Sequence, residues 1–266
     1  MIIDFHTHVF PDDRAQRLLS EVSNHAGIPS YSDGSLKGLL NSMDRAGVDI
    51  SVISRIAVKP HNVEQLNTWL NSVKMKNIIP MAAWHPDLSI ESSLIIEFKV
   101  TGFRCIKLHP DYQGFYVDEK RIFPFYEAAE YAAMPVLLYA GIDRGLPSKI
   151  HASPERIRLV HDRFPDLKII AAHMGGEGNY EKTEEFLLGE DIYFDTSFVL
   201  QKMPLNILER FFMRHPVERI LFGSDSPWSD QAQELDYFQK LKFLSADAKE
   251  KILRKNASEL LEMEKI

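Results

Sequence analysis

The chain has 266 residues and a formal net charge of −7, and 45% of its residues are hydrophobic and 26% charged, as in ordinary globular proteins. The negative charge and the lack of a Lys/Arg-rich run argue against a nucleic-acid partner, and no apolar run approaches the about 20 residues that a membrane helix needs. No N-terminal secretion signal is visible and the single cysteine, Cys105, excludes an internal disulfide, so we expect a cytoplasmic protein.

Short apolar or β-branched runs alternate along the chain with longer stretches of helical periodicity. The predicted strands are residues 2–6, 48–53, 78–83, 102–108, 136–139, 167–172, 192–195 and 220–222. The predicted helices are residues 35–46, 62–76, 90–100, 118–133, 154–164, 180–188, 204–214, 231–241 and 245–261. Such alternation favours a parallel sheet covered by helices, and eight repeats in about 260 residues fit a closed (β/α)8 TIM barrel. We therefore predict one barrel domain over residues 1–266, with a doubly wound open sheet as the alternative.

Residues 11–34 form a longer and less periodic connection than the others. A loop of this length in a compact domain is often functional, and we expect it to pass over the mouth of the barrel. Four aromatic residues lie near predicted strand ends, where they either line an apolar pocket or pack within loops. They are Tyr112, Phe115, Tyr116 and Trp228.

The first strand, in MIIDFHTHVF, carries two histidines one residue apart. Because side chains alternate along a strand, Asp4, His6 and His8 are expected on one face. Two neighbouring imidazoles are costly to bury, since each needs partners for two ring nitrogens. A divalent metal ion would satisfy one nitrogen of each ring, so the pair predicts a metal site.

Polar side chains also follow most of the other predicted strands, at the carboxyl ends where the active sites of such barrels lie. They are His85, Lys107, His109, Tyr139, His173 and Asp225. Histidine and carboxylate ligands suit zinc, and also manganese, iron or nickel. A catalytic zinc keeps one open position for water, whose pKa it lowers to about 7. We expect one divalent metal ion, with zinc preferred.

Seven stretches in this order carry a resemblance to a known family: DFHTHVF, GFRCIKLHP, MPVLLYAG, LKIIAAHMGG, IYFDTS, RILFGSDSPW and NASELLEM. Together they resemble the amidohydrolase-related metal-dependent hydrolases, in the (β/α)8 branch that includes aromatic-acid decarboxylases. The resemblance implies that His6 and His8 bind the metal and that Asp225 is both a metal ligand and a proton acceptor. It implies that His173 ligates the metal or activates water. Paired barrels are common among such relatives, so a homodimer is a further expectation.

One position departs from the family pattern. Many members carry a histidine ligand after the fifth strand, in a PVLxH setting, where this chain has Tyr139. A neutral phenol, with a pKa of about 10, is a poor ligand. His109, His173 or water molecules are the alternatives for the missing ligand. A two-metal site bridged by a carbamylated Lys107, as the resemblance to distant relatives would imply, is not expected.

Three hypotheses for function follow. The first is a hydrolase that uses metal-activated water on an amide, lactone or ester of a small molecule, with Asp225 and His173 as catalytic residues. The second is a non-oxidative decarboxylase or hydratase of a hydroxylated aromatic or unsaturated acid, with Arg55 and Lys107 as possible partners of the carboxylate. The third is a non-catalytic barrel with a degraded metal site. The expected substrate-binding residues are Lys107, His109, Tyr139 and Tyr112, whereas His85 and Cys105 are interpreted as packing residues.

Overall fold

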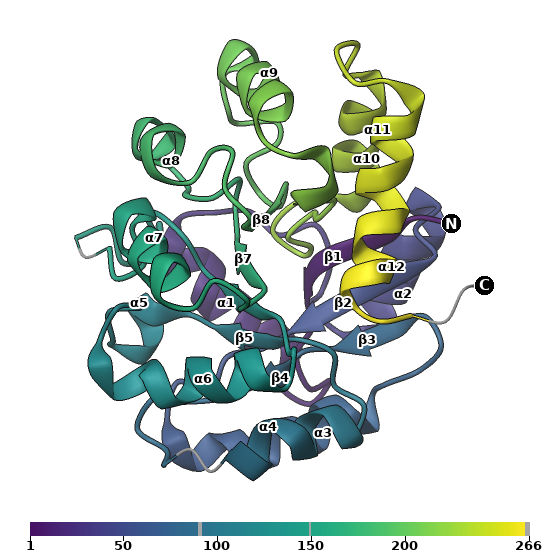
Figure 1. Ribbon diagram of the computed structural model, residues 1–266. Coiled ribbons are helices and arrows are strands. Elements are labelled where there is room, and N and C mark those ends of the chain that lie inside the picture. Colours follow the sequence, from purple (N-terminus) through teal and green to yellow (C-terminus); the bar gives the residue numbers. More distant parts are fainter. Residues whose placement is uncertain (90–91, 149, 264–266) are drawn as a thin grey trace.

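Parallel strands occupy the centre of the molecule and helices surround them in the computed structural model, which describes residues 1–89, 92–148 and 150–263 (Figure 1). The strands are β1 (Ile3–His8), β2 (Ile50–Ser54), β3 (Ile78–Pro80), β4 (Ala82–Ala83), β5 (Ile106–Leu108), β6 (Val136–Leu138), β7 (Ile169–Ala171), β8 (Tyr193–Asp195) and β9 (Ile220–Leu221). Hydrogen bonding orders them as β1-β2-β3 and as β4-β5-β6-β7-β8-β9.

Backbone hydrogen bonds join these two sheets into a closed barrel. The predicted third strand, residues 78–83, is interrupted at Met81, whose amide donates to the carbonyl of Ile53 at 2.9 Å and so continues the pairing with β2. At the other seam Phe5 donates to the carbonyl of Phe222 and Asp225 donates to that of His6, both at 2.8 Å. The predicted (β/α)8 barrel is therefore confirmed, and the doubly wound alternative is wrong.

The helices follow the predicted alternation, with local differences. They are α1 (Ala15–Ala26), α2 (Leu36–Ala46), α3 (Val63–Ser72), α4 (Ser92–Val100), α5 (Pro110–Gln113), α6 (Phe123–Tyr131), α7 (Pro154–Arg163), α8 (Tyr180–Phe186), α9 (Leu205–Arg214), α10 (Gln231–Lys240), α11 (Ala246–Glu250) and α12 (Asn256–Leu260). The predicted last helix is divided by a π-helical segment, Lys251–Lys255, between α11 and α12. Residues 90–91 of the predicted helix 90–100 lie outside the described residues. Within the described part of the chain, no helix is long and apolar enough to cross a membrane.

The connection at residues 11–34 contains α1, a helix that is not among the predicted helices. Ala15, Leu18, Leu19 and Val22 follow helical spacing, and Ala15 and Leu19 are the buried residues of this helix. Other α1 side chains line the main cavity of the barrel, among them Leu18 and Val22. The excursion therefore forms part of the wall of the cavity at the mouth.

A register shift in β1 decides which side chains face the barrel interior. The pairing of β1 with β2 is regular at Ile3 and Asp4 but shifts before Thr7, as in a β-bulge. Phe5 packs with interior side chains such as Cys105, whereas the carboxylate of Asp4 accepts a hydrogen bond from Gln231 of α10, outside the barrel, at 2.8 Å. The expectation that Asp4 shares a face with His6 is therefore wrong, because a bulge re-aims the residues that follow it.

Candidate active site

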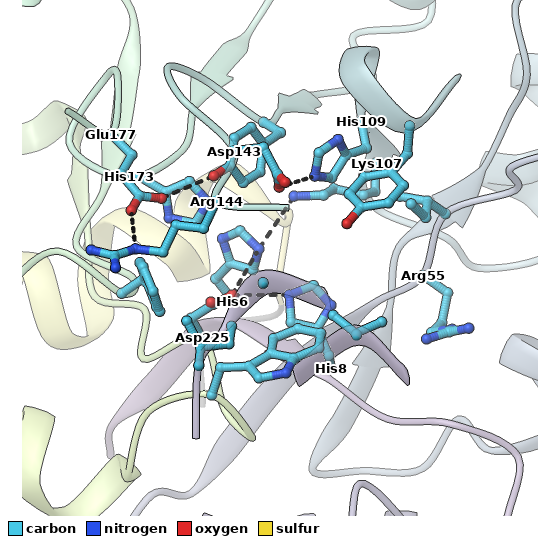
Figure 2. Close-up of a pocket in the computed structure, with 18 of the residues that line it drawn as sticks. His6, His8, Arg55, Lys107, His109, Asp143, Arg144, His173, Glu177 and Asp225 are labelled. Atoms are coloured by element: carbon cyan, nitrogen blue, oxygen red, sulfur yellow. Dashed lines mark hydrogen bonds and ion pairs between the residues drawn. The ribbon is translucent and has the colours of Figure 1, made fainter. Parts of the chain in front are cut away.

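Side chains from four parts of the barrel meet at the carboxyl ends of the strands (Figure 2). His6 and His8 come from β1, Lys107 from β5, His173 follows β7 and Asp225 follows β9. They line a cavity of about 270 Å³. The structure thus brings together all of the residues that were predicted to bind a metal.

The hydrogen bonds of His6 determine which ring nitrogen carries its proton. Nδ1 lies 2.8 Å from a carboxylate oxygen of Asp195, to which it donates, so Nε2 carries the lone pair, toward which Nζ of Lys107 points at 3.2 Å. Nε2 faces Oδ1 of Asp225 at 3.7 Å. Burial, followed by the charge of Lys107, lowers the pKa of His6 to about 3, so the ring is neutral at pH 7. A carboxylate behind a histidine is the usual arrangement that orients a metal ligand.

His8 and His173 have the same tautomer as His6. Nδ1 of His8 donates to the carbonyl of Ser54 at 3.2 Å, and Nδ1 of His173 donates to the carbonyl of Ser197 at 3.0 Å. Since a carbonyl can only accept, Nδ1 is the donor in both rings. Nε2 of His173 is buried and has no hydrogen-bond partner among the residues that the structure describes.

The donor set around Asp225 fits a divalent cation. Nε2 of His8 and Oδ1 of Asp225 are 3.0 Å apart, and both atoms carry lone pairs unless a proton or a metal ion lies between them. Burial lowers the pKa of His8, which disfavours the proton. One ligand atom each from His6, His8 and Asp225 lie within 4.8 Å of one another, and His6, His173 and Asp195 form a second such group. Two imidazole nitrogens and a carboxylate oxygen match the ligands of zinc and related metals.

The backbone at this centre adopts an uncommon conformation. His173 has a φ of 59° and Asp225 a φ of 69°, both in the left-handed region, which costs about 1–3 kcal/mol for such residues. Gly223 allows the close approach behind His6, because a Cβ added there would lie 2.9 Å from Cβ of His6. Left-handed conformations of this kind cluster at functional sites, where surrounding contacts maintain them.

Lys107 places a positive charge beside the candidate metal ligands. Its Nζ is 3.2 Å from Nε2 of His6, and the side chain is 1% exposed. Burial lowers the pKa of Lys107 to about 8. No carboxylate of residues 1–89, 92–148 or 150–263 forms an ion pair with it. Lys107 can therefore offer its ammonium group to an anionic oxygen in the cavity.

A network of paired side chains forms the opposite wall of the cavity (Figure 2). Nε2 of His109 is 3.3 Å from the carboxylate of Asp143, and the phenol of Tyr139 donates to Glu177 at 2.9 Å. Arg144 donates to the same Glu177 at 3.1 Å. Burial and then the Glu177 charge hold the pKa of Tyr139 well above its usual value, so the phenol stays protonated. His109 belongs to neither of the candidate ligand groups found among the described residues.

The rest of the cavity is largely apolar, with one cation. Phe10, Phe198, Tyr112 and Trp228 line it. The guanidinium of Arg55 lies 4.0 Å from the centre of the Phe10 ring, and its Nε has no hydrogen-bond partner in the described part of the chain. This end of the cavity can therefore receive a carboxylate.

Three other residues that were singled out near predicted strand ends do not line this cavity: Phe115, Tyr116 and His85. Phe115 is fully buried in the outer core, and Tyr116 packs against the ring of His151. Nδ1 of His85 accepts from the amide of Asp87 at 3.1 Å, in keeping with a packing residue.

Three carboxylates that hold the site together are not among the predicted site residues: Asp195, Asp143 and Glu177. Asp195 and Ser197 lie in the stretch IYFDTS, at and just after the end of a predicted strand, and this position was a usable signal, whereas Asp143 and Glu177 lie in no quoted stretch. The hydroxyl of Ser197 donates to Asp195. These residues act through contacts with other strands, which spacing along the chain cannot reveal.

A model of the amidohydrolase family matches residues 3–263 of the chain. No curated protein sequence matches this chain.

Among solved structures, an uncharacterized TIM-barrel protein from Bordetella bronchiseptica has 22% sequence identity and a TM-score of 0.75, with 98% of each chain covered. A dihydroxybenzoic acid decarboxylase from a Polaromonas species, with manganese and the inhibitor 2-nitroresorcinol bound, has 17% identity and a TM-score of 0.75, covering 100% of this chain and 98% of that chain. A probable 2-pyrone-4,6-dicarboxylic acid hydrolase from Acinetobacter baumannii, with citric acid bound, has 16% identity and a TM-score of 0.69, covering 98% and 99% of the two chains. At these identities the similarity shows a shared fold.

Proposed function

The chain belongs to the amidohydrolase family of enzymes, and on this basis we propose that it is a metal-dependent hydrolase of a small molecule that carries a carboxylate. The scissile group is an amide, lactone or ester. The observation that carries this proposal is the convergence of histidine lone pairs on Asp225, next to a cavity lined by Arg55, whose Nε has no hydrogen-bond partner among the described residues. These features supply proton acceptors for a hydrolytic water and a cationic partner for the substrate.

In this proposal His6, His8 and Asp225 hold one divalent metal ion, with His173 close by. A bound divalent ion acts as a Lewis acid and lowers the pKa of a water molecule from 15.7 to about 7. Zinc is the preferred ion, and manganese is the first alternative because the Polaromonas decarboxylase binds it.

The protein groups then act on substrate and water. Asp225 accepts the proton of the attacking water and returns it to the leaving group. His173, whose Nε2 has no partner among the described residues, orients the water through that lone pair. Lys107 donates to the oxygen that develops negative charge, and Arg55 binds the distant carboxylate. The aromatic walls exclude bulk water, which strengthens these interactions.

Non-oxidative decarboxylation of an aromatic or unsaturated acid is the second candidate. The buried ammonium of Lys107 favours it, because this group lies beside His6 and can serve as a partner for the carboxylate that leaves. The Polaromonas relative is a decarboxylase of a hydroxylated aromatic acid, which supports the same substrate class.

Metal analysis and a substrate panel test both candidates. Protein produced with zinc, manganese and iron should contain about one metal ion per chain, and His8→Ala should lose it while His85→Ala keeps it. Acid released from carboxylate-bearing lactones, esters or amides supports hydrolysis, whereas CO2 released from hydroxybenzoates supports decarboxylation. Metal-free protein that turns over neither class would contradict both. The homodimer and the cytoplasmic location remain predictions from the sequence.

A further inference from the structure

A second cavity, of about 260 Å³, lies directly against the first. Four residues line both cavities: Ile28, Arg144, Phe198 and Trp228. We call the second one the outer cavity and define it by Tyr31, Gln201, Lys202, Ser229 and Glu234, which line it alone. The two cavities are therefore neighbours that share part of their lining.

Glu234 of α10 is the buried acid of the outer cavity. It is 3% exposed, and its Oε1 accepts a hydrogen bond from Nε2 of Gln201 at 2.9 Å. The other oxygen, Oε2, is buried and has no donor in the described residues. Burial raises the pKa of Glu234 to about 7. A buried carboxylate oxygen without a donor is costly, and buried polar groups in proteins are normally paired.

Two donors line the same cavity. Lys202 has an exposed side chain whose Nζ lies 2.7 Å from the centre of the Phe198 ring, and it forms no ion pair with the residues that the structure describes. Nε1 of Trp228 is buried and also has no partner in the described part of the chain. The outer cavity is therefore lined by an acceptor, on Glu234, and by donors on two other side chains, Lys202 and Trp228.

We propose that the outer cavity is a second binding subsite, which takes a polar end of the substrate carrying an N–H donor beside a carbonyl acceptor, as a primary carboxamide does. The N–H donates to Oε2 of Glu234 and the carbonyl oxygen accepts from Lys202. A simple carboxylate would satisfy Lys202 but would be repelled by ionised Glu234, which is why a carboxamide fits better. The inference rests on the proposed function in one respect, since the reacting end of the substrate must occupy the first cavity.

Calorimetric titration with two matched probes tests this subsite without turnover. Both probes are benzoates, one with a carbamoylmethyl arm at position 3 and the other with a 2-oxopropyl arm of nearly equal shape. They differ in that the second has a methyl group where the first has the NH2 group. At pH 8, where Glu234 is ionised, the carboxamide should bind at least about ten-fold more tightly, as expected for a hydrogen bond to a charged acceptor.

Variants separate the two contacts. Glu234→Met removes the acceptor with an unbranched side chain of similar length, and it should make the two probes bind equally. Lys202→Met should weaken both probes and leave their ratio unchanged, because both carry the carbonyl group. Glu209→Met, at an exposed position outside both cavities, is the matched control and should behave like the wild type. Thermal unfolding establishes that each variant is folded.

Two results would overturn the inference: equal binding of the probes to the wild type, or a preference for the carboxamide that survives Glu234→Met. If neither probe binds to the wild type, the inference is overturned as well. The proposed function fails by different measurements, namely metal content and product release, so the two failures can be told apart.

Discussion

Replacing Asp195 by asparagine should weaken metal binding without changing the size of the side chain. Oδ1 of Asp195 accepts from the amides of His173 and Ser197, both at 3.1 Å, and from the hydroxyl of Ser197. These three donors fix the orientation of an asparagine, because its oxygen must occupy the Oδ1 position. The NH2 group then faces Nδ1 of His6, where Oδ2 now accepts at 2.8 Å.

The consequence is a change of tautomer in His6. Nδ1 has to become the acceptor, so the proton moves to Nε2, which is the atom directed at Asp225 and the metal position. Loss of a carboxylate behind a ligating histidine typically lowers metal affinity 10- to 100-fold, equivalent to about 1.4–2.7 kcal/mol. We expect a loss in this range for both zinc and manganese.

Metal titration against a competing chelator measures this loss on metal-free protein. The matched control is Asp236→Asn, since Asp236 is exposed and pairs only with Lys240 of its own helix in the described structure. Wild-type affinity in a folded Asp195→Asn protein would refute the reasoning, because it would mean that Nε2 of His6 is not a metal ligand.

Three further predictions concern the substrate, the space around the site and the pH. Arg55→Met should raise KM about 10- to 100-fold for substrates that bear a carboxylate, and it should leave KM unchanged for analogues without one, as steady-state kinetics would reveal. Gly223→Ala should lower the unfolding free energy by about 1–3 kcal/mol and reduce metal affinity, because the added Cβ meets Cβ of His6 at 2.9 Å. Urea unfolding measures the first effect and the chelator titration the second, and a variant unchanged in both would contradict this prediction. Burial lowers the pKa of His215 from 6.5 to about 4 in the folded protein. Above pH 6.5 the His215 ring is neutral in both the folded and the unfolded protein. Between pH 6.5 and 4 only the unfolded protein binds a proton at this ring, so the stability of the folded protein falls as the pH falls. At pH 5 this loss of stability is about 2 kcal/mol. The unfolding free energy of His215→Gln, measured with urea, should therefore fall by about 2 kcal/mol less than that of the wild type between pH 7 and pH 5. An identical pH dependence of the two proteins would contradict this prediction.

Local signals were sufficient for most of the elements. Ser35 caps α2 by accepting from the amide of Gly38, and Gly47 ends it in the left-handed conformation, so both ends of this helix are decided by neighbours in sequence. Most strand predictions were longer than the observed strands, as for residues 102–108 against Ile106–Leu108, whereas the first strand extends to His8, beyond the predicted residues 2–6. Pairing with neighbouring strands decides these ends, and composition alone does not encode it.

The sequence by itself determined the barrel and the chemistry available at its mouth, because alternation along strands and helices is a property of neighbouring residues. It also put the rings of His6 and His8 near each other, and their centres are 5.1 Å apart. Only the tertiary structure decided which atoms of those rings are free. The partner that sets the tautomer of His6 is Asp195, which is 189 positions away, and the bulge in β1 directs His6 away from the face of Asp4. Contacts of this kind depend on barrel closure and strand register, which no local spacing specifies.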